Sequence, residues 1–116
     1  MNKNLGFVQR LGFALNGIRS TWRTENSFKA EVCVALGAVG LLLYFRPAAI
    51  WWVLFIITIA AVLGAELMNT ALENLMDKLH PEVHPLIGLA KDCAAGAVLL
   101  LCIASVGVVA AMLISL

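Results

Sequence analysis

Four polar residues recur at helical spacing within a long apolar stretch of this chain, and their types suit metal binding and proton transfer. They are Glu66, Asn69, Glu73 and Asp77. On an α-helix all four would fall within a sector of about 80°. A carboxylate at membrane depth is costly unless it faces protein, a metal ion or a partner, so Glu66 and Glu73 point to a functional site.

Two further polar clusters flank the other apolar stretches. One, at the start of the first stretch, holds Glu25, Lys29 and Glu31. The other, at the start of the last stretch and shortly after Glu82 and His84, holds Lys91 and Asp92. Carboxylate and amide oxygens are ligands for a hard divalent cation, and lysine neutralises phosphate oxygens. Together the clusters favour magnesium with a nucleotide.

Structural alternatives exist for each of these residues. Glu66 and Glu73 could pair with basic residues across a helix interface. Asn69 could form a hydrogen bond between helices. Lys91 and Asp92 could be an interfacial pair at a helix end. We expect half-solvated positions for Lys29, Glu31 and Asp77.

The composition indicates a membrane protein. Of 116 residues, 62% are hydrophobic and 13% are charged, and the mean hydropathy is +0.95. This is too apolar for a soluble domain of this length. A net charge of +1 gives no basic face for a phosphate backbone, which excludes a nucleic-acid partner.

The apolar pattern predicts an all-α membrane protein that forms one domain over residues 1–116. Three transmembrane helices are expected, because a span needs about 20 largely apolar residues. Before them, apolar residues recur every three or four positions, which predicts an amphipathic helix on the membrane surface. The alternative is a fourth core helix packed on the spans. The expected ranges are 6–24 for the surface helix and 28–45, 48–78 and 85–115 for the spans.

Basic residues predict the orientation. They are concentrated before the first span and around the second loop, whereas the first loop holds only Arg46. The positive-inside rule then places the N-terminus and the second loop in the cytoplasm. The basic residues on that side are Lys3, Arg10, Arg19, Arg23, Lys29, Lys78 and Lys91.

Residues 66–77 closely resemble the E-x-x-N-S/T-A-I/L-E-x-x-x-D signature of the small integral-membrane diacylglycerol kinases of bacteria. Residues 24–31 resemble that family's element before the first span. Residues 90–98 resemble its A-K-D element, and residues 17–19 also match. The resemblance covers nearly the whole chain in order and length.

The resemblance implies an ATP- and magnesium-dependent lipid kinase of the bacterial cytoplasmic membrane. It also implies a homotrimer whose active sites are shared between subunits. Glu66 would be the general base that accepts the proton of the lipid hydroxyl. Glu25 and Glu73 would hold metal ions, while Asn69 and Lys91 would steady the γ-phosphoryl group.

The same resemblance places further residues at the two substrates. Asp92 would lie near the nucleoside, together with Glu82, Val83 and His84. Ala95 stands at a substrate position where diacylglycerol-specific relatives carry serine. This alanine, together with the His84-Pro85 sequence that leads into the last span, is more like the undecaprenol-phosphorylating branch of the family. The acceptor is therefore either diacylglycerol, giving phosphatidic acid, or undecaprenol, giving its monophosphate.

A rival hypothesis is a small proton-coupled membrane transporter in which Glu66 binds a cation and a proton in turn. Such a carrier needs a single carboxylate at mid-depth. It does not need the carboxylate and lysine clusters that the sequence places at one cytoplasmic level. The clusters therefore favour the kinase.

Overall fold

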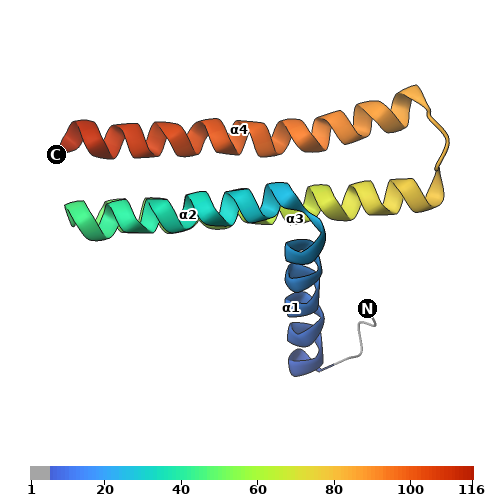
Figure 1. The fold of residues 1–116 in the computed structure, drawn as a ribbon, viewed down its shortest axis with the longest axis horizontal. Helices are drawn as coiled ribbons and strands as arrows, with labels where there is room; N and C mark the ends of the chain where they lie inside the picture. The colour runs from blue at the N-terminus through green and yellow to red at the C-terminus, as the bar shows by residue number, and fades with distance from the viewer. Residues whose placement is uncertain (1–5) are drawn as a thin grey trace.

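The computed structural model describes residues 6–116, which form four α-helices joined by short connections (Figure 1). Lys3, one of the basic residues that favour a cytoplasmic N-terminus, lies outside the described residues. The helix bounds fall within two residues of the expected ranges. The helices are α1 (Phe7–Thr24), α2 (Asn26–Phe45), α3 (Ala49–Leu79) and α4 (Pro85–Ser115).

The chain reverses direction sharply between α2 and α3. Arg46 caps α2 in the left-handed conformation, with φ 45° and ψ 58°, and its N–H donates to the carbonyl of Leu42 at 2.9 Å. Pro47 follows directly, and a proline disfavours helical backbone at the residue before it. The helix therefore stops here, and α3 returns alongside α2.

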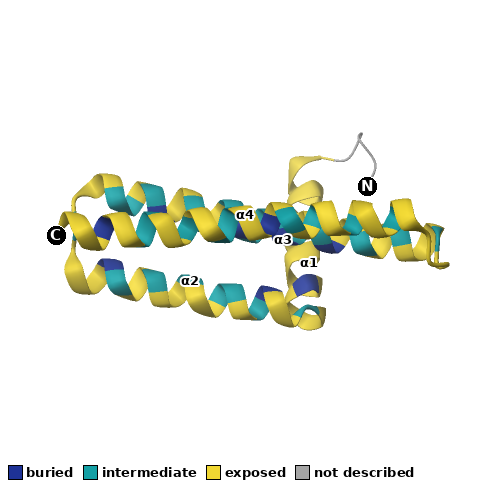
Figure 2. Ribbon diagram, turned by 90° about the horizontal axis from the view of Figure 1, so that it is seen from above, coloured by how far each residue is buried: buried dark blue, intermediate teal, exposed yellow. Residues whose placement is uncertain are grey.

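A second reversal joins α3 to α4 through residues 80–84. Pro85 occupies the first turn of α4, where its missing N–H is tolerated. The Nδ1 atom of His84 accepts a hydrogen bond from the backbone N–H of Leu86 at 3.1 Å and so caps the helix. As a result α3 and α4 form an antiparallel hairpin and pack side by side (Figures 1 and 2).

Three of the helices are long and apolar enough to cross a membrane: α2, α3 and α4. At 1.5 Å per residue, the 31 residues of α3 span about 46 Å, whereas a hydrocarbon core is about 30 Å thick. One end of α3 therefore extends beyond the hydrocarbon. The protein is thus an all-helical, multi-pass membrane protein.

The tightest apolar packing lies at the end of the bundle opposite residues 80–84. Leu42, Phe55 and Met112 are buried there against one another, one from each long helix. Most other side chains on these helices are exposed in the single chain (Figure 2). Membrane helices associate through such close packing rather than through removal of apolar surface from water.

Helix α1 runs across the direction of the three long helices (Figure 1). Its apolar stripe stays exposed in the single chain, while its C-terminal part contacts α2 and α3. Only Thr21 is buried among its residues. The location of this stripe on a membrane surface stays a prediction. The stripe consists of Phe7, Leu11, Leu15, Ile18 and Trp22.

Leu42→Ala should destabilise the bundle by about 2–5 kcal/mol, because it leaves a cavity between three helices that cannot fully close. The free energy of unfolding in mixed micelles, followed by circular dichroism, measures this loss. Leu36→Ala on the same helix is the matched control, since Leu36 is 67% exposed. Unchanged stability of Leu42→Ala would contradict the described packing.

Candidate functional site

The four polar residues of the stripe lie on α3 and become more exposed toward its C-terminal end. Glu66 is buried, with 5% of its surface exposed. Asn69 and Glu73 are half-buried, and Asp77 is exposed. A polar track thus connects the interior of the helix bundle with the open end near residues 80–84.

Glu66 contacts two polar residues of α2. The hydroxyl of Ser27 donates a hydrogen bond to Oε1 of Glu66 at 2.9 Å. The carboxyl group of Glu31 lies near that of Glu66. The Oε2 atom of Glu31 is buried and has no hydrogen-bond partner within residues 6–116. A buried oxygen without a partner is a position where a ligand hydroxyl could donate.

Ser27 is a residue that the sequence did not assign to the site, and Glu31 belongs to a polar cluster but was given no role. Glu31 is half-buried, as expected, and its carboxyl group lies near that of Glu66. One signal was available, because Ser27 and Glu31 are four residues apart and share one face of α2. The sequence pattern does not predict where α2 crosses α3, and this crossing brings together Ser27 and Glu66, which are 39 positions apart.

An apolar cavity of about 590 Å³ lies between α2, α3 and α4 and reaches Glu31. Among the described residues that line it, Glu31 is the one charged side chain. The rest are mainly alanine and branched apolar residues, with Thr58, Cys102 and Ser105 as weakly polar members. The hydroxyls of Thr58 and Ser105 donate to backbone carbonyls of their own helices. The cavity suits a hydrocarbon chain whose polar end lies near Glu66.

Asn69 and Glu73 form the middle of the polar track. The Nδ2 group of Asn69 donates to Oε1 of Glu73 at 3.5 Å, which is a long hydrogen bond. The Oδ1 atom of Asn69 is buried and lacks a partner among residues 6–116. The pair therefore presents one amide oxygen and a half-buried carboxylate to a possible ligand.

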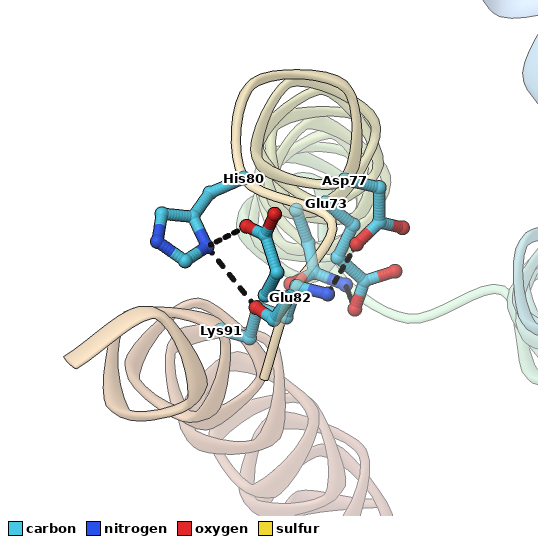
Figure 3. A network of polar contacts seen from close by, with 6 residues as sticks. Glu73, Asp77, His80, Glu82 and Lys91 are labelled. Carbon is cyan, nitrogen blue, oxygen red and sulfur yellow. Dashed lines mark hydrogen bonds and ion pairs between the residues drawn. The ribbon is translucent and has the colours of Figure 1, made fainter. Parts of the chain in front are cut away.

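Lys91 reaches from α4 to the end of the track. Its Nζ atom donates to Oδ1 of Asp77 and forms an ion pair with it. Figure 3 shows Glu73 and Asp77 on one side of α3, with the Lys91 side chain extending from α4 toward them. Lys91 and Glu73 are thus brought to the same end of the hairpin.

The residues expected near the nucleoside lie at or beside the connection between α3 and α4. His80 Nδ1 donates to the carbonyl of Glu82 at 3.1 Å and lies 3.4 Å from its Oε2 atom (Figure 3). Val83 is fully exposed, and His84 caps α4. Farther along α4, Asp92 and Ala95 are exposed.

Glu25 occupies the junction between α1 and α2, where its extended backbone separates the two helices. A cavity of about 450 Å³ lies beside it, lined by α1 residues up to Thr24 and by α3 residues that include Asn74. Neither Glu25 nor Glu73 is among the described residues that line it. The structure shows no contact between them within residues 6–116.

Residues 6–116 contain no cluster of three or more histidine, cysteine, aspartate or glutamate side chains that could enclose a metal ion. Magnesium rarely needs such a cluster, since it commonly takes one or two carboxylates and completes its shell with phosphate oxygens and water. The half-buried carboxylate of Glu73 fits that requirement.

Comparison with known proteins places this chain in a family. The pattern of the family described as prokaryotic diacylglycerol kinase matches residues 12–113. The diacylglycerol kinase of Escherichia coli K12 is 33% identical over 108 residues, covering 90% of this chain and 88% of that protein. The undecaprenol kinase of Bacillus subtilis is 34% identical over 92 residues, covering 79% and 75% respectively. This protein therefore belongs to the prokaryotic diacylglycerol kinase family.

Proposed function

We propose that this protein is a lipid kinase that transfers the γ-phosphoryl group of ATP, with magnesium, to the hydroxyl group of a membrane lipid. The observation that carries the proposal is the position of Glu66. Its buried carboxylate adjoins the Glu31 end of an apolar cavity and the inner end of a polar track. A lipid and a water-soluble nucleotide can therefore approach it from opposite directions.

At the lipid side, Glu66 is the general base. It accepts the proton of the lipid hydroxyl while the hydroxyl oxygen attacks the γ-phosphorus atom. The bond from that phosphorus to the bridging oxygen of ADP breaks, so the products are ADP and a phosphorylated lipid. Ser27 holds one oxygen of Glu66 and fixes the direction of the carboxylate. A positioned base of this kind contributes about 10²–10⁴-fold to a rate.

At the nucleotide side, Glu73 and Glu25 hold magnesium ions that neutralise the phosphate oxygens of ATP. Asn69 and Lys91 steady the γ-phosphoryl group. The nucleoside lies near Asp92 and the connection formed by Glu82, Val83 and His84. The exposed position of that connection, at the open end of the polar track, supports this assignment because a nucleotide arrives from water.

The functional unit is a homotrimer with active sites shared between subunits. Two observations support it. Large apolar side chains stay exposed on every long helix, and Glu25 makes no contact with Glu73 within the described part of one chain. A neighbouring copy can supply the missing side of the site. The trimer lies in the bacterial cytoplasmic membrane with the connection between α3 and α4 in the cytoplasm.

The acceptor is diacylglycerol or undecaprenol. The two relatives compared above carry these names, one each. The exposed Ala95 lies one helical turn beyond Lys91 and adds no hydroxyl group to that face of α4. Each acceptor has one free hydroxyl, but diacylglycerol also carries two ester groups, whereas a polyprenol has no other polar group. A methyl group at this position, which offers no hydrogen bond to an ester, therefore favours undecaprenol.

Transfer of label from γ-labelled ATP to lipid tests the proposed function. The full chain in nanodiscs should phosphorylate at least one of two acceptors, diacylglycerol or undecaprenol, supplied at equal concentration with magnesium. We expect the faster rate with undecaprenol. Absence of labelled lipid with both acceptors would contradict the lipid-kinase proposal and favour the transporter hypothesis, which a proton-flux assay in liposomes then tests.

Glu66→Gln should lower kcat by about 10²-fold or more, because the amide cannot accept the hydroxyl proton. Binding of magnesium-ATP should stay within about twofold of wild type, since Glu66 faces the lipid rather than the nucleotide. Turnover and equilibrium nucleotide binding measure the two effects separately. Met68→Leu is the control on the same helix, at a residue that is 64% exposed. Wild-type turnover in Glu66→Gln would rule out the general-base role.

Glu73→Gln should weaken magnesium-ATP binding by about tenfold or more, as expected when a carboxylate at a metal site is lost. Titration of kinase activity with magnesium measures the shift, and the required magnesium concentration should rise. Lys78→Gln is the control, at an exposed position five residues further along α3. An unchanged magnesium titration in Glu73→Gln would show that Glu73 is not a metal ligand.

A further inference from the structure

Asp77 is the last residue of the E-x-x-N-S/T-A-I/L-E-x-x-x-D pattern, and the proposed mechanism gives it no role. It lies one helical turn beyond Glu73, near the end of α3. Its side chain is 64% exposed, so it is not required to fill the interior of the bundle. The structure nevertheless gives it one specific partner, Lys91 on the neighbouring helix.

The contact joins two helices across 14 positions in the sequence. A lysine ammonium group has three N–H donors, and its four-carbon stem takes many conformations. One donor is directed at Asp77, which leaves two for other oxygens. The Lys91 side chain is 33% exposed, and its charged end pairs with Asp77 at the open end of the polar track.

We propose that Asp77 is a positioning residue for phosphoryl transfer: its carboxylate holds the ammonium group of Lys91 beside Glu73, with two N–H donors available to phosphate oxygens. This inference rests on the proposed function, in which Lys91 steadies the γ-phosphoryl group. A correctly placed charge acts in the transition state without first being reoriented. Asp77 supplies that placement and does not itself touch the substrate.

A second consequence concerns Glu73. Glu73 lies on the same side of α3 as Asp77 and faces the same region (Figure 3). Without Asp77, the nearest carboxylate on α3 for the flexible Lys91 side chain is Glu73, the proposed magnesium ligand. An ion pair there would compete with the metal. Asp77 therefore keeps the lysine and the metal ligand apart.

A stabilising role alone does not account for this pair. Exposed ion pairs contribute little to the free energy of folding, typically about 0–1 kcal/mol. If the ion pair stabilises the transition state by the same free energy, the rate of phosphoryl transfer rises by up to about fivefold. The variant that removes only the charge, Asp77→Asn, separates the two roles, because it keeps the size of the side chain.

The kinetic test uses the full chain in nanodiscs with magnesium, ATP and the acceptor that wild type phosphorylates faster. Asp77→Asn should lower kcat by about fivefold with a smaller change in the KM for ATP. Asp77→Glu should restore most of the rate, because it returns the carboxylate. Lys78→Gln, at the adjacent exposed position, should behave as wild type. In a Lys91→Ala background, Asp77→Asn should cause no further loss.

Unchanged kcat in Asp77→Asn would overturn the inference. The inference would also be overturned if Asp77→Asn lowered kcat equally in the Lys91→Ala background. It would be overturned too if a fall in Tm accounted for the lost activity and Asp77→Glu did not reverse that fall. An inactive wild type would instead refute the proposed function. An active wild type with an insensitive Asp77→Asn variant refutes the positioning role alone.

A chemical readout tests the contact without using activity. Acylation of lysine amines by an N-hydroxysuccinimide ester, quantified by mass spectrometry, compares Lys91 with Lys78 in the same molecule. The carboxylate of Asp77 shields Lys91, and Glu73 could replace it, so the comparison is made in a Glu73→Gln background. There the ratio of Lys91 to Lys78 labelling should rise in Asp77→Asn and return in Asp77→Glu. An unchanged ratio would overturn the proposed contact.

Discussion

The burial of a carboxylate within an apolar helix bundle is the constraint on which this structure depends. An ionisable group at such a position needs polar partners, since neither lipid nor apolar side chains can solvate it. Glu66 has them because α2 crosses α3 where Ser27 and Glu31 can reach it. The same crossing leaves one buried oxygen of Glu31 without a partner at the end of an apolar cavity. An acceptor hydroxyl would complete this arrangement.

Because α3 is longer than the bilayer is thick, one helix connects the lipid interior with the surrounding water. Its apolar part matches the thickness of a bilayer, and its C-terminal turns carry the polar track toward water. The hairpin with α4 then brings Lys91 to the outer end of that track, where it pairs with Asp77. A kinase that phosphorylates a membrane lipid must join these two environments, and a single long helix provides the connection.

Much of this fold follows from local sequence signals. The Arg46-Pro47 and Pro85 positions mark helix ends because proline restricts its neighbours and lacks an N–H donor. The polar residues of α3 could be grouped from helical spacing alone. The contacts of Ser27 and Glu31 with Glu66 could not, since they depend on where two helices cross. The partner of Lys91 likewise depends on the packing of α3 against α4. The relation of Glu25 to Glu73 depends, in the proposed trimer, on how neighbouring subunits pack, which local sequence signals do not specify.

In the proposed mechanism, nucleotide binds at the open end of the α3 track while lipid lies at its buried end. Paramagnetic relaxation measured by NMR in nanodiscs tests this directly, with Mn²⁺ replacing Mg²⁺ in a complex with a non-hydrolysable ATP analogue. We expect the strongest signal loss at Glu73, Asp77 and Lys91, a weaker loss at Glu66, and none at Phe55 or Met112. Signal loss centred on the Leu42, Phe55 and Met112 cluster, or none on α3, would contradict it.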